Sequence, residues 1–539
     1  MTAHLASRGC TLHGVSRSPP VAFALSGNRQ PALSLFRAKP SEPAGQGEML
    51  MKTVSAQTSR SSGLQSIEGR AAATGALARL GIRFTAWAER WFPDAFIFVA
   101  IAVVLVALGA LANGAPAAAV AKTFGDGFWS LIPFTMQMAF VTIGGYVVAT
   151  SPPVQFLIDR LARIPRTGRG AVGLVAAATM LSSFLSWGLS LIFGGLLARA
   201  LARRTELNMD YRAAGAAAYL GLGATWAMGL SSSAAQLQAN PKSLPPNVLP
   251  ITGVIPFSET IFLWQSMLIA LVLFLVSVAI AYASAPAAVS AVTAQDLGVD
   301  VSAKEEKLDP PAQPGEKLEH WPLLNILLVI IAGGWIWQEF ARQSWIVAIS
   351  NLNTYNLLFL TLGLLLHWRP KRFLVAVAKS VPATAGVLIQ FPLYASISAI
   401  LTGAKNASGD TLSEVISHAF VSFNTAGSYP LSMGVYSAVL GFFVPSGGGK
   451  WLLEAPYVMQ AANELKVHLG WAVMIYNAAE ALPNLINPFW MLPLLGILGL
   501  KARDIVGFSF LQLLVHLPVV LFLLWALAFT LTYHPPVMP

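Results

Sequence analysis

Several stretches of the chain run for about twenty residues or more without a charged side chain. Among them are 95–113, 127–150, 171–198 and 213–241. A helix of about 20 apolar residues spans the hydrocarbon core of a bilayer, and lipid leaves the backbone few alternatives to helices. Only 11% of the residues are charged, whereas soluble domains carry about 25%. The sequence therefore predicts an all-α polytopic membrane protein, embedded in a lipid bilayer.

The net charge of +10 comes largely from basic residues in short loops beside the apolar runs. Such placement is the positive-inside signature of membrane topology, and it argues against a nucleic-acid partner. The single cysteine, Cys10, permits neither a disulfide nor a cysteine-based metal site within one chain.

Residues 1–75 are rich in Ser, Arg, Gly and Pro and contain no long apolar run. The apolar core of a secretory signal peptide is missing, so we expect a disordered N-terminal extension. Met49 and Met51 are alternative starts of translation.

Basic residues assign the sides of the membrane. Arg79, Arg83 and Arg90 precede the first apolar run and place the N-terminus in the cytoplasm. Segment 171–198 has basic residues on both flanks, so both flanks are expected to be cytoplasmic. One run of this length cannot cross twice as two full helices at 1.5 Å per residue. A re-entrant hairpin that turns near 182–188 satisfies both constraints.

The second half repeats the order of the first. From residue 352 onward we expect helix, helix, hairpin, broken helix and helix, now starting outside, with the second hairpin turning at 445–450. Two inverted-topology repeats with about 11 transmembrane helices are thus predicted, an architecture of many secondary transporters. The expected boundaries are 76–283 for the first repeat, 284–320 for a cytoplasmic linker, 321–345 for a connecting transmembrane helix and 346–539 for the second repeat.

Transporters of this plan bind substrates where helices are interrupted, because the helix ends offer N–H and C=O groups. Besides the two hairpin turns, breaks are expected at 229–233 and 480–488. The candidate substrate-binding residues are Ser182, Ser183, Ser186, Ser231, Ser232, Ser233, Ser446, Gly447, Gly448, Gly449, Lys450, Asn484 and Asn487. The serines could bind ligand or bond back to their own helix. The glycines allow close backbone approach or positive φ, and the asparagines could satisfy a kink instead.

Two charged residues in these segments have alternative roles. Lys450 could pair with a substrate carboxylate or with Glu454 one turn later. Glu480 is a candidate for the coupling proton, because ionisable groups inside a membrane are costly; capping of the broken helix is the alternative. His418 and His468 are expected at the surface near the outer face. No cofactor is expected, and the coupling ion, H⁺ or Na⁺, stays open, as does any metal site.

Several motifs resemble the short-chain fatty acid transporter family over about residues 80–530: 90–96, 181–188, 443–451 and 477–480. The resemblance implies uptake of short-chain fatty acids such as butyrate and acetoacetate across the bacterial inner membrane. It also implies kinship with the ion transporter superfamily, which has two hairpins and two broken helices and many dimeric members, so a homodimer is implied. Hairpins of those relatives carry Ser-Asn-Thr. This chain has Ser182-Ser183-Phe184 and Ser446-Gly447-Gly448 there, a departure that weakens the case for Na⁺ coupling and for a dicarboxylate site built from that motif.

We therefore expect a cation-coupled secondary transporter of short-chain monocarboxylates. The carboxylate would lie at the broken-helix ends near Lys450, and the short tail would face Trp187 and Phe443. The alternative is a sodium- or proton-coupled dicarboxylate or other anion carrier of the same fold. An intramembrane enzyme would need a nucleophile and a base together at membrane depth, and no histidine falls near the serine breaks; no enzyme is expected.

Overall fold

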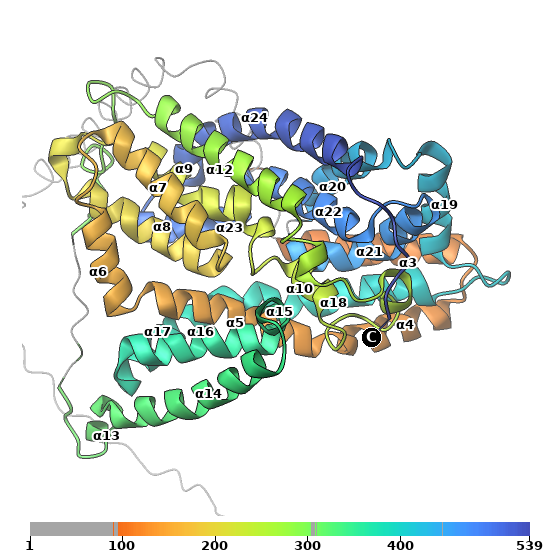
Figure 1. Cartoon of the computed structure of the whole chain (residues 1–539), viewed down its shortest axis with the longest axis horizontal. Coiled ribbons are helices and arrows are strands. Elements are labelled where there is room, and N and C mark those ends of the chain that lie inside the picture. The colour runs from red at the N-terminus through yellow and green to blue at the C-terminus, as the bar shows by residue number, and fades with distance from the viewer. Residues whose placement is uncertain (1–89, 91–94, 303–307, 309, 445, 539) are drawn as a thin grey trace, which may run out of the picture. The chain divides into compact units, whose positions relative to one another are not determined.

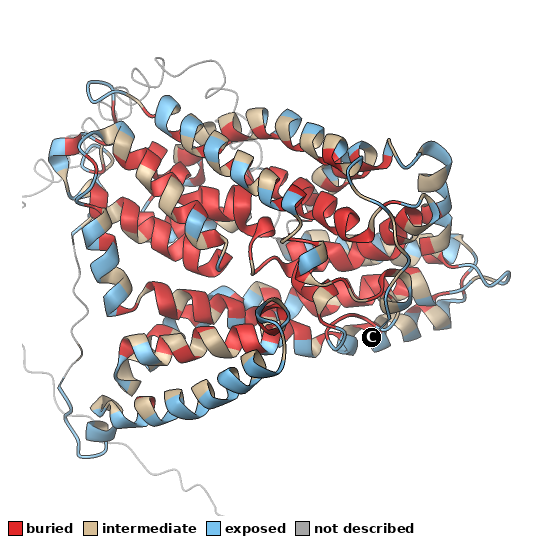
Figure 2. Cartoon of the chain, viewed as in Figure 1, coloured by how far each residue is buried: buried red, intermediate tan, exposed pale blue. Residues whose placement is uncertain are grey.

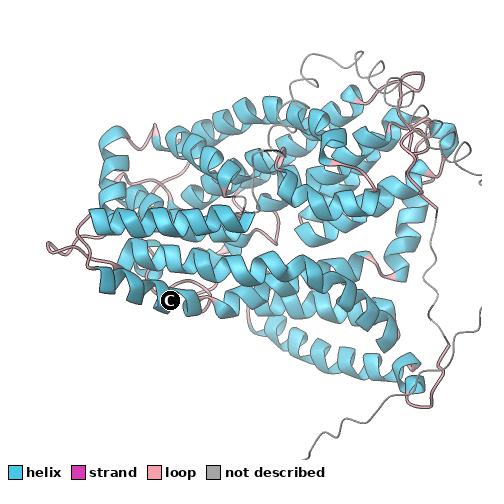
Figure 3. Cartoon of the chain, turned by 180° about the vertical axis from the view of Figure 1, so that it is seen from behind, coloured by secondary structure: helices cyan, strands magenta, loops and turns pink. Residues whose placement is uncertain are grey.

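The computed structural model describes residues 90, 95–302, 308, 310–444 and 446–538 (Figure 1). The expected N-terminal extension, 1–75, lies outside them. The described residues form helices and no strand, apart from one isolated bridge between Lys405 and Thr411 (Figure 3). The prediction of an all-α fold is confirmed.

The first half contains a helical hairpin and an interrupted helix where the sequence predicted them. The hairpin turns at 184–186, and the interrupted helix breaks at 229–232 after a π-helical and a 3₁₀ turn. The elements are α3 (Ala95–Ala112), α4 (Ala117–Ser130), α5 (Ile132–Ala149), α6 (Pro152–Leu161), the hairpin α7 (Gly168–Ser183) and α8 (Trp187–Ala202), η1 (Thr205–Leu207), the interrupted helix α9 (Tyr211–Leu220), η2 (Gly221–Thr225), η3 (Trp226–Met228) and α10 (Ser233–Ala239), then α11 (Leu249–Thr252), η4 (Phe257–Glu259) and α12 (Trp264–Ser284).

The second half follows the same order. Its hairpin turns at 444–446 and its last interrupted helix breaks at 485–487. The elements are α16 (Leu352–His367), α17 (Pro370–Ser380), η5 (Val381–Thr384), α18 (Ala385–Gly403), α19 (Leu412–Phe423), the hairpin α20 (Tyr429–Phe443) and α21 (Gly447–Glu464), the interrupted helix α22 (Leu469–Asn484) and α23 (Pro488–Leu498), and α24 (Ala502–Ala528).

Equivalent helices make equivalent contacts in the two halves. Helices α3, α5 and α8 of the first half correspond to α16, α18 and α21 of the second. Helix α3 packs on α18, and its equivalent α16 packs on α5. Within each half, α5 packs on the hairpin arm α8, and α18 packs on the hairpin arm α21. Each hairpin also contacts the interrupted helix of the other half, through α8 with α23 and α21 with α10. The two halves are thus interlocked rather than merely adjacent, and the interruptions of both come together in the middle of the bundle (Figure 1).

The segment between the two halves is hydrogen-bonded to two arginines at the C-terminal end of α8. Arg199 donates to the carbonyl of Asp300 (2.7 Å) and Arg203 to that of Val301 (2.9 Å). After α13 (Glu316–His320), helix α14 (Leu323–Arg342) leads through α15 (Trp345–Ser350) into the second half. Helix α14 packs on α16 but is otherwise exposed, with 75% of Trp337 accessible (Figure 2). An apolar helix with this exposure belongs in lipid.

Five described helical segments are long and apolar enough to cross a membrane: Ile132–Ala149, Trp264–Ser284, Leu323–Arg342, Pro370–Gly403 and Ala502–Ala528. Shorter apolar helices stand beside them, among them Trp187–Ala202. Trp187–Ala202 begins at the first hairpin turn, where buried neighbours satisfy its backbone end.

The sequence did not predict the amphipathic helices α6, α17 and α19, nor the division of segment 127–150. Pro133, the second residue of α5, has no N–H to continue the hydrogen bonds of α4, so the helix restarts at Ile132.

The C-terminal segment turns back onto the first half. Val254 donates to the carbonyl of Val537 (2.8 Å), and Gly253, with φ of +62°, leaves room for the Val537 backbone. His534 Nε2 lies 2.8 Å from a carboxylate oxygen of Glu259. The Tyr533 hydroxyl lies 3.2 Å from the side-chain oxygen of Asn463, near the end of α21. The segment therefore contacts both halves.

Candidate functional site

The first hairpin turn is held against the break of the neighbouring helix. Ser186 caps α8 by accepting a hydrogen bond from the Leu189 N–H, and Trp187 N–H donates to Ser231 Oγ (2.9 Å). Leu230 N–H donates to the carbonyl of Phe184 (2.8 Å). These bonds satisfy backbone groups that a bilayer cannot, so Ser186 and Ser231 have structural partners.

Ser182 and Ser183 end helix α7. Both hydroxyls bond back to their own helix, to the carbonyls of Thr179 and Met180, and Ser183 also lies 2.8 Å from Thr225 Oγ1. For these two residues the structure shows the back-bonding alternative.

The second hairpin turn is built on glycine because its neighbours are rings. A Cβ on Gly447 would lie 2.0 Å from the Trp226 ring, and one on Gly449 would lie 2.1 Å from the Tyr394 ring. A Cβ on Gly448 would lie 3.1 Å from the Cβ of Ser233. None of the three glycines has positive φ. Close approach of the backbone, not left-handed conformation, therefore explains this run.

The two helix breaks leave buried polar atoms without hydrogen-bond partners among the described residues. Ser232 precedes α10 but its hydroxyl makes no cap bond, and it is fully buried. Asn484 Oδ1 and Trp226 Nε1 are likewise buried without a partner. Buried polar groups are usually paired, so Asn484 and Trp226, which line the cavity described next, are candidates to meet a ligand, whereas Ser232 is not among the lining residues. Asn487 is buried in the second break.

A small cavity, of about 30 Å³, lies where hairpins and breaks meet. Its polar lining comes from Ser233, Ser446 and Asn484 and from the backbone of Gly447 and Gly448. Its apolar lining comes from Met138, Trp187, Leu222, Trp226, Val387, Phe391 and Trp490. The structure thus brings together residues that the sequence predicted from three of the four interruptions, with Trp187 as the predicted apolar wall. The side chain of Phe443 lies outside the described side chains.

Three helices begin at this cavity: α8 with Trp187, α21 with Gly447, and α23 two residues before Trp490. Helix N-termini carry partial positive charge and free N–H groups. No lysine, arginine or acidic residue lines the cavity in the described part of the chain. The arrangement suits one anionic group at the helix starts and a small apolar body among the indoles.

Lys450 does not line the cavity. Its Nζ is fully buried one turn behind the second hairpin turn, 2.6 Å from Glu454 Oε1 and 3.0 Å from Glu480 Oε2. It also contacts Ser437 and lies 4.2 Å from the centre of the Tyr476 ring. The pairing with Glu454 that the sequence allowed is present, and Glu480 lies within α22, one turn before its last residue, Asn484.

The two histidines expected near the surface differ. His418 is exposed and lies 3.7 Å from Glu464. His468 is half-buried: its Nδ1 accepts a hydrogen bond from Trp471 N–H (3.0 Å) and caps α22, and its ring meets the ring of His534 edge-on. His468, His534 and Glu259 form the one group of three possible metal-ligating side chains found among the described residues.

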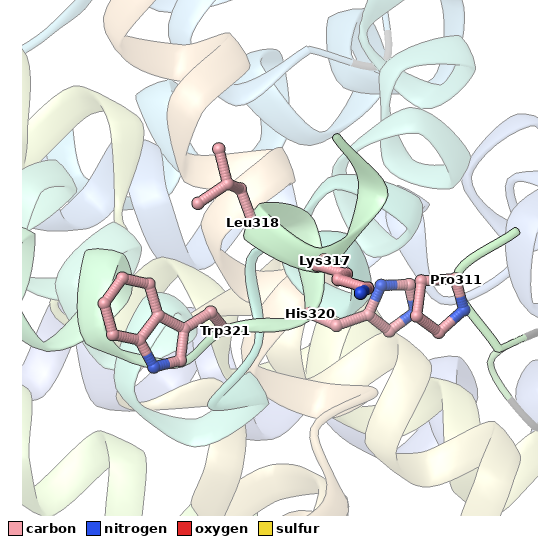
Figure 4. Close-up of a pocket in the computed structure, with 5 residues that line it drawn as sticks. All are labelled: Pro311, Lys317, Leu318, His320 and Trp321. Atoms are coloured by element: carbon pink, nitrogen blue, oxygen red, sulfur yellow. The ribbon is translucent and has the colours of Figure 1, made fainter. Parts of the chain in front are cut away.

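A larger hollow of about 370 Å³ lies beside α13, lined by Pro311, Lys317, Leu318, His320 and Trp321 (Figure 4). All five residues come from one short stretch at the surface. It contains none of the predicted site residues, so we do not assign the site there.

Sequence reasoning missed Trp226, Phe391 and Trp490. Their types gave no signal, because an indole or phenyl ring in an apolar segment usually packs in a core or faces lipid. Only the proximity of Trp226 to the Gly229 break could have indicated it.

Two hairpins and two interrupted helices that enclose one cavity in an apolar helical bundle define a polytopic membrane transporter. The solved structure of MtrF from Neisseria gonorrhoeae, described as illuminating a class of antimetabolite efflux pumps, shares this fold, with a TM-score of 0.53 over 85% of this chain and 100% of that one at 13% identity.

The chain belongs to the short-chain fatty acid transporter family, whose profile matches residues 76–527. A protein of Escherichia coli (strain K12) that is provisionally named a short-chain fatty acid transporter is 33% identical over 440 residues, which are 81% of this chain and 97% of that protein. A protein of Haemophilus influenzae with the same provisional name is 30% identical over 451 residues, 82% of this chain and 98% of that protein. The family comprises transporters, not enzymes.

Proposed function

We propose that this protein is a cation-coupled secondary transporter that carries short-chain monocarboxylates, such as butyrate and acetoacetate, across the bacterial inner membrane. The observation that carries the proposal is a cavity lined from both halves, with helix starts and indole rings around it. A carboxylate would accept N–H groups of α8 and α21 and the hydroxyl of Ser232 or Ser233. The short alkyl tail would lie against Trp187 and Trp226.

The volume of the cavity favours a cycle in which access alternates. About 30 Å³ holds roughly two water molecules, which is less than a four-carbon acid needs. Substrate entry therefore requires the hairpin turns to move away from the breaks. We propose that the hairpins are re-entrant, that the halves are inverted repeats with a cytoplasmic N-terminus, and that the protein works as a homodimer.

The absence of a cation in the described cavity lining favours monocarboxylates over the alternative, a dicarboxylate or other anion carrier. A second carboxylate would need a second positive partner. Lys450, predicted as a carboxylate partner, already faces two carboxylates of the protein. We propose that the coupling cation is a proton and that Glu480 carries it.

Uptake by the purified protein in proteoliposomes tests the proposal. Labelled butyrate should accumulate saturably in the vesicles when the outside is more acidic than the inside. Acetoacetate should compete with butyrate, whereas succinate should not. Uptake of succinate in place of butyrate would move the substrate class to dicarboxylates. Accumulation driven by a Na⁺ gradient alone would exclude the proton.

A further inference from the structure

Lys450, Glu454 and Glu480 form a charge cluster sealed from solvent, with all three side chains fully buried. In the described part of the chain, no other Lys, Arg or His lies within 4.0 Å of either carboxylate. If every group were ionised, the cluster would carry one positive and two negative charges. A net charge buried at this depth is far more costly than a neutral cluster.

The surrounding groups supply no second positive charge. The titratable residues that face the carboxylates are tyrosines: Tyr394 on α18, Tyr429 and Tyr436 on α20, Tyr457 on α21 and Tyr476 on α22. Phenol hydroxyls are uncharged at neutral pH.

Two of the other helices that pack here carry a histidine, and each directs it elsewhere. His418 of α19 faces Glu464, and His516 of α24 lies 3.0 Å from Ser277 of α12. The excess negative charge must therefore be removed by a bound cation, and the smallest is a proton on one carboxyl.

The contacts distinguish the two carboxyls. The three N–H groups of Lys450 have three acceptors in hydrogen-bond geometry: the carbonyl and hydroxyl of Ser437 and Oε1 of Glu454. Glu480 lies 3.0 Å from the ammonium, but neither of its oxygens has hydrogen-bond geometry with a donor of the described residues. It lies against the backbone of α20, where a Cβ on Gly441 would be 2.6 Å from Oε2. Glu480 is thus the less firmly bonded carboxyl.

We propose that Lys450, Glu454 and Glu480 form a site for one proton, which the two carboxyls share and Glu480 mainly carries. The inference rests on the proposed function and deepens it. Asn484, in the cavity lining, lies one turn after Glu480 on α22, and Gly447 lies one turn before Lys450 on α21. Because the substrate anion and the cluster share these two helices, the anion binds beside a neutral cluster and is repelled by a negative one. Proton and carboxylate therefore travel together, and Lys450 balances the protein's own carboxylates rather than the substrate.

Infrared spectroscopy of the purified full-length protein tests the proton site without any substrate. At neutral pH, the wild type should show the C=O stretch of a protonated buried carboxyl. Glu480→Gln should abolish it. Glu454→Gln should abolish it as well, because one remaining carboxylate balances Lys450. Lys450→Met should strengthen it, because both carboxyls must then be neutral. Glu464→Gln, on the same helix α21 but facing His418, is the matched control and should leave the band unchanged.

A band that survives Glu454→Gln would overturn the sharing, because it would show an independently protonated Glu480. A band absent from the wild type, or displaced by Na⁺ at constant pH, would overturn the proton site itself. Melting and gel filtration identify variants that fail to fold, and Glu480→Asp, which keeps a carboxyl, should retain the band if that position tolerates change.

Transport separates this inference from the proposed function. In proteoliposomes, Glu480→Gln should retain exchange of labelled butyrate for unlabelled butyrate but lose accumulation driven by a pH gradient. A wild type that shows the band but moves no butyrate would refute the substrate class and leave the proton site standing. A Glu480→Gln protein that still accumulates butyrate with the pH gradient would refute the coupling role.

Discussion

At the scale of single residues, adjacent positions have opposite roles. Ser231 holds the first hairpin turn through Trp187 N–H, whereas the hydroxyl of Ser232 has no partner among the described residues. Identical residue types in one run therefore separate into one member with a structural partner and one whose buried hydroxyl is unpaired among the described residues.

We predict that Ser231→Ala lowers the free energy of unfolding by about 1 kcal/mol, because a buried N–H loses its acceptor. Ser232→Ala should leave stability unchanged and weaken butyrate binding by roughly 10–100-fold, since a hydrogen bond to a charged group contributes about 1.5–3 kcal/mol. Thermal melts and uptake constants measure the two effects. Equal transport by Ser232→Ala and wild type would remove this serine from the site.

Glycine at the second hairpin turn is required by packing. Gly447→Ala should destabilise the protein by about 1–3 kcal/mol through overpacking against Trp226 and reduce uptake. Gly496→Ala, at a position where an added Cβ meets nothing within 4 Å, is the control and should gain stability, by up to about 1 kcal/mol. The double variant Gly447→Ala/Trp226→Phe should recover part of the lost stability, and failure to do so would place the strain elsewhere.

At the scale of elements, the C-terminal segment contacts one histidine of the helical bundle, because the ring of His534 meets that of His468 edge-on. Burial, together with the neighbouring His534 ring, holds the pKa of His468 below its usual range. The native state thus binds a proton at His468 less readily than the unfolded chain. Its contribution to stability is present above the ordinary histidine value of about 6.5 and is lost as the pH falls below it. Protonated Nδ1 also cannot accept the Trp471 N–H.

We therefore predict that the segment loosens on acidification. A spin label on Met538→Cys, in a Cys10→Ser background, should become more mobile as the pH falls below about 6.5. His468→Asn keeps a capping acceptor that does not titrate and should remove this pH dependence. An unchanged spectrum in the parent protein across this range would contradict the prediction.

Much of the element order could be predicted from the sequence, since charge-free runs indicate the length and position of apolar segments directly. The first hairpin turn, 184–186, falls inside the predicted segment 182–188. The second lies between α20 and α21 and only overlaps the start of the predicted segment 445–450, because Gly447 to Lys450 already belong to α21. The three amphipathic helices α6, α17 and α19 were missed because hydropathy alone does not distinguish them from polar loops.

The site was predicted less completely, because its walls are assembled over long range. Asn484, Ser446 and Ser233 stood at visible breaks and do line the cavity. Trp226, Phe391 and Trp490 reach it only through the interlocking of two halves, and the contact of Lys450 with Glu480 joins two helices whose register the sequence does not reveal.

At the scale of the whole molecule, the proposed transport cycle requires the hairpin turn of each half to move away from the helix break of the other half. Gly448 of the second hairpin meets Ser233 of the first half at 3.1 Å, measured from an added Cβ to the Ser233 Cβ. This approaches the Cβ separation of about 3.5–4.5 Å in disulfides. Oxidation of a Gly448→Cys/Ser233→Cys protein in a Cys10→Ser background should stop butyrate uptake, and reduction should restore it.

The same protein before and after reduction serves as its own control. Uptake that persists in the cross-linked protein would show that these two segments need not separate during the cycle.

The docked C-terminal segment also bears on how this protein can be handled. Val537 is hydrogen-bonded to Val254, so a partner fused after residue 539 would follow a segment that is held against the bundle. An affinity tag or fluorescent reporter fused there would start from a fastened strand of chain. Such a fusion could disturb the contact of His534 with Glu259, in the loop that leads into α12, and the neighbouring cap of α22 at His468. Fusion partners for purification or imaging are better placed before residue 76, ahead of the family region.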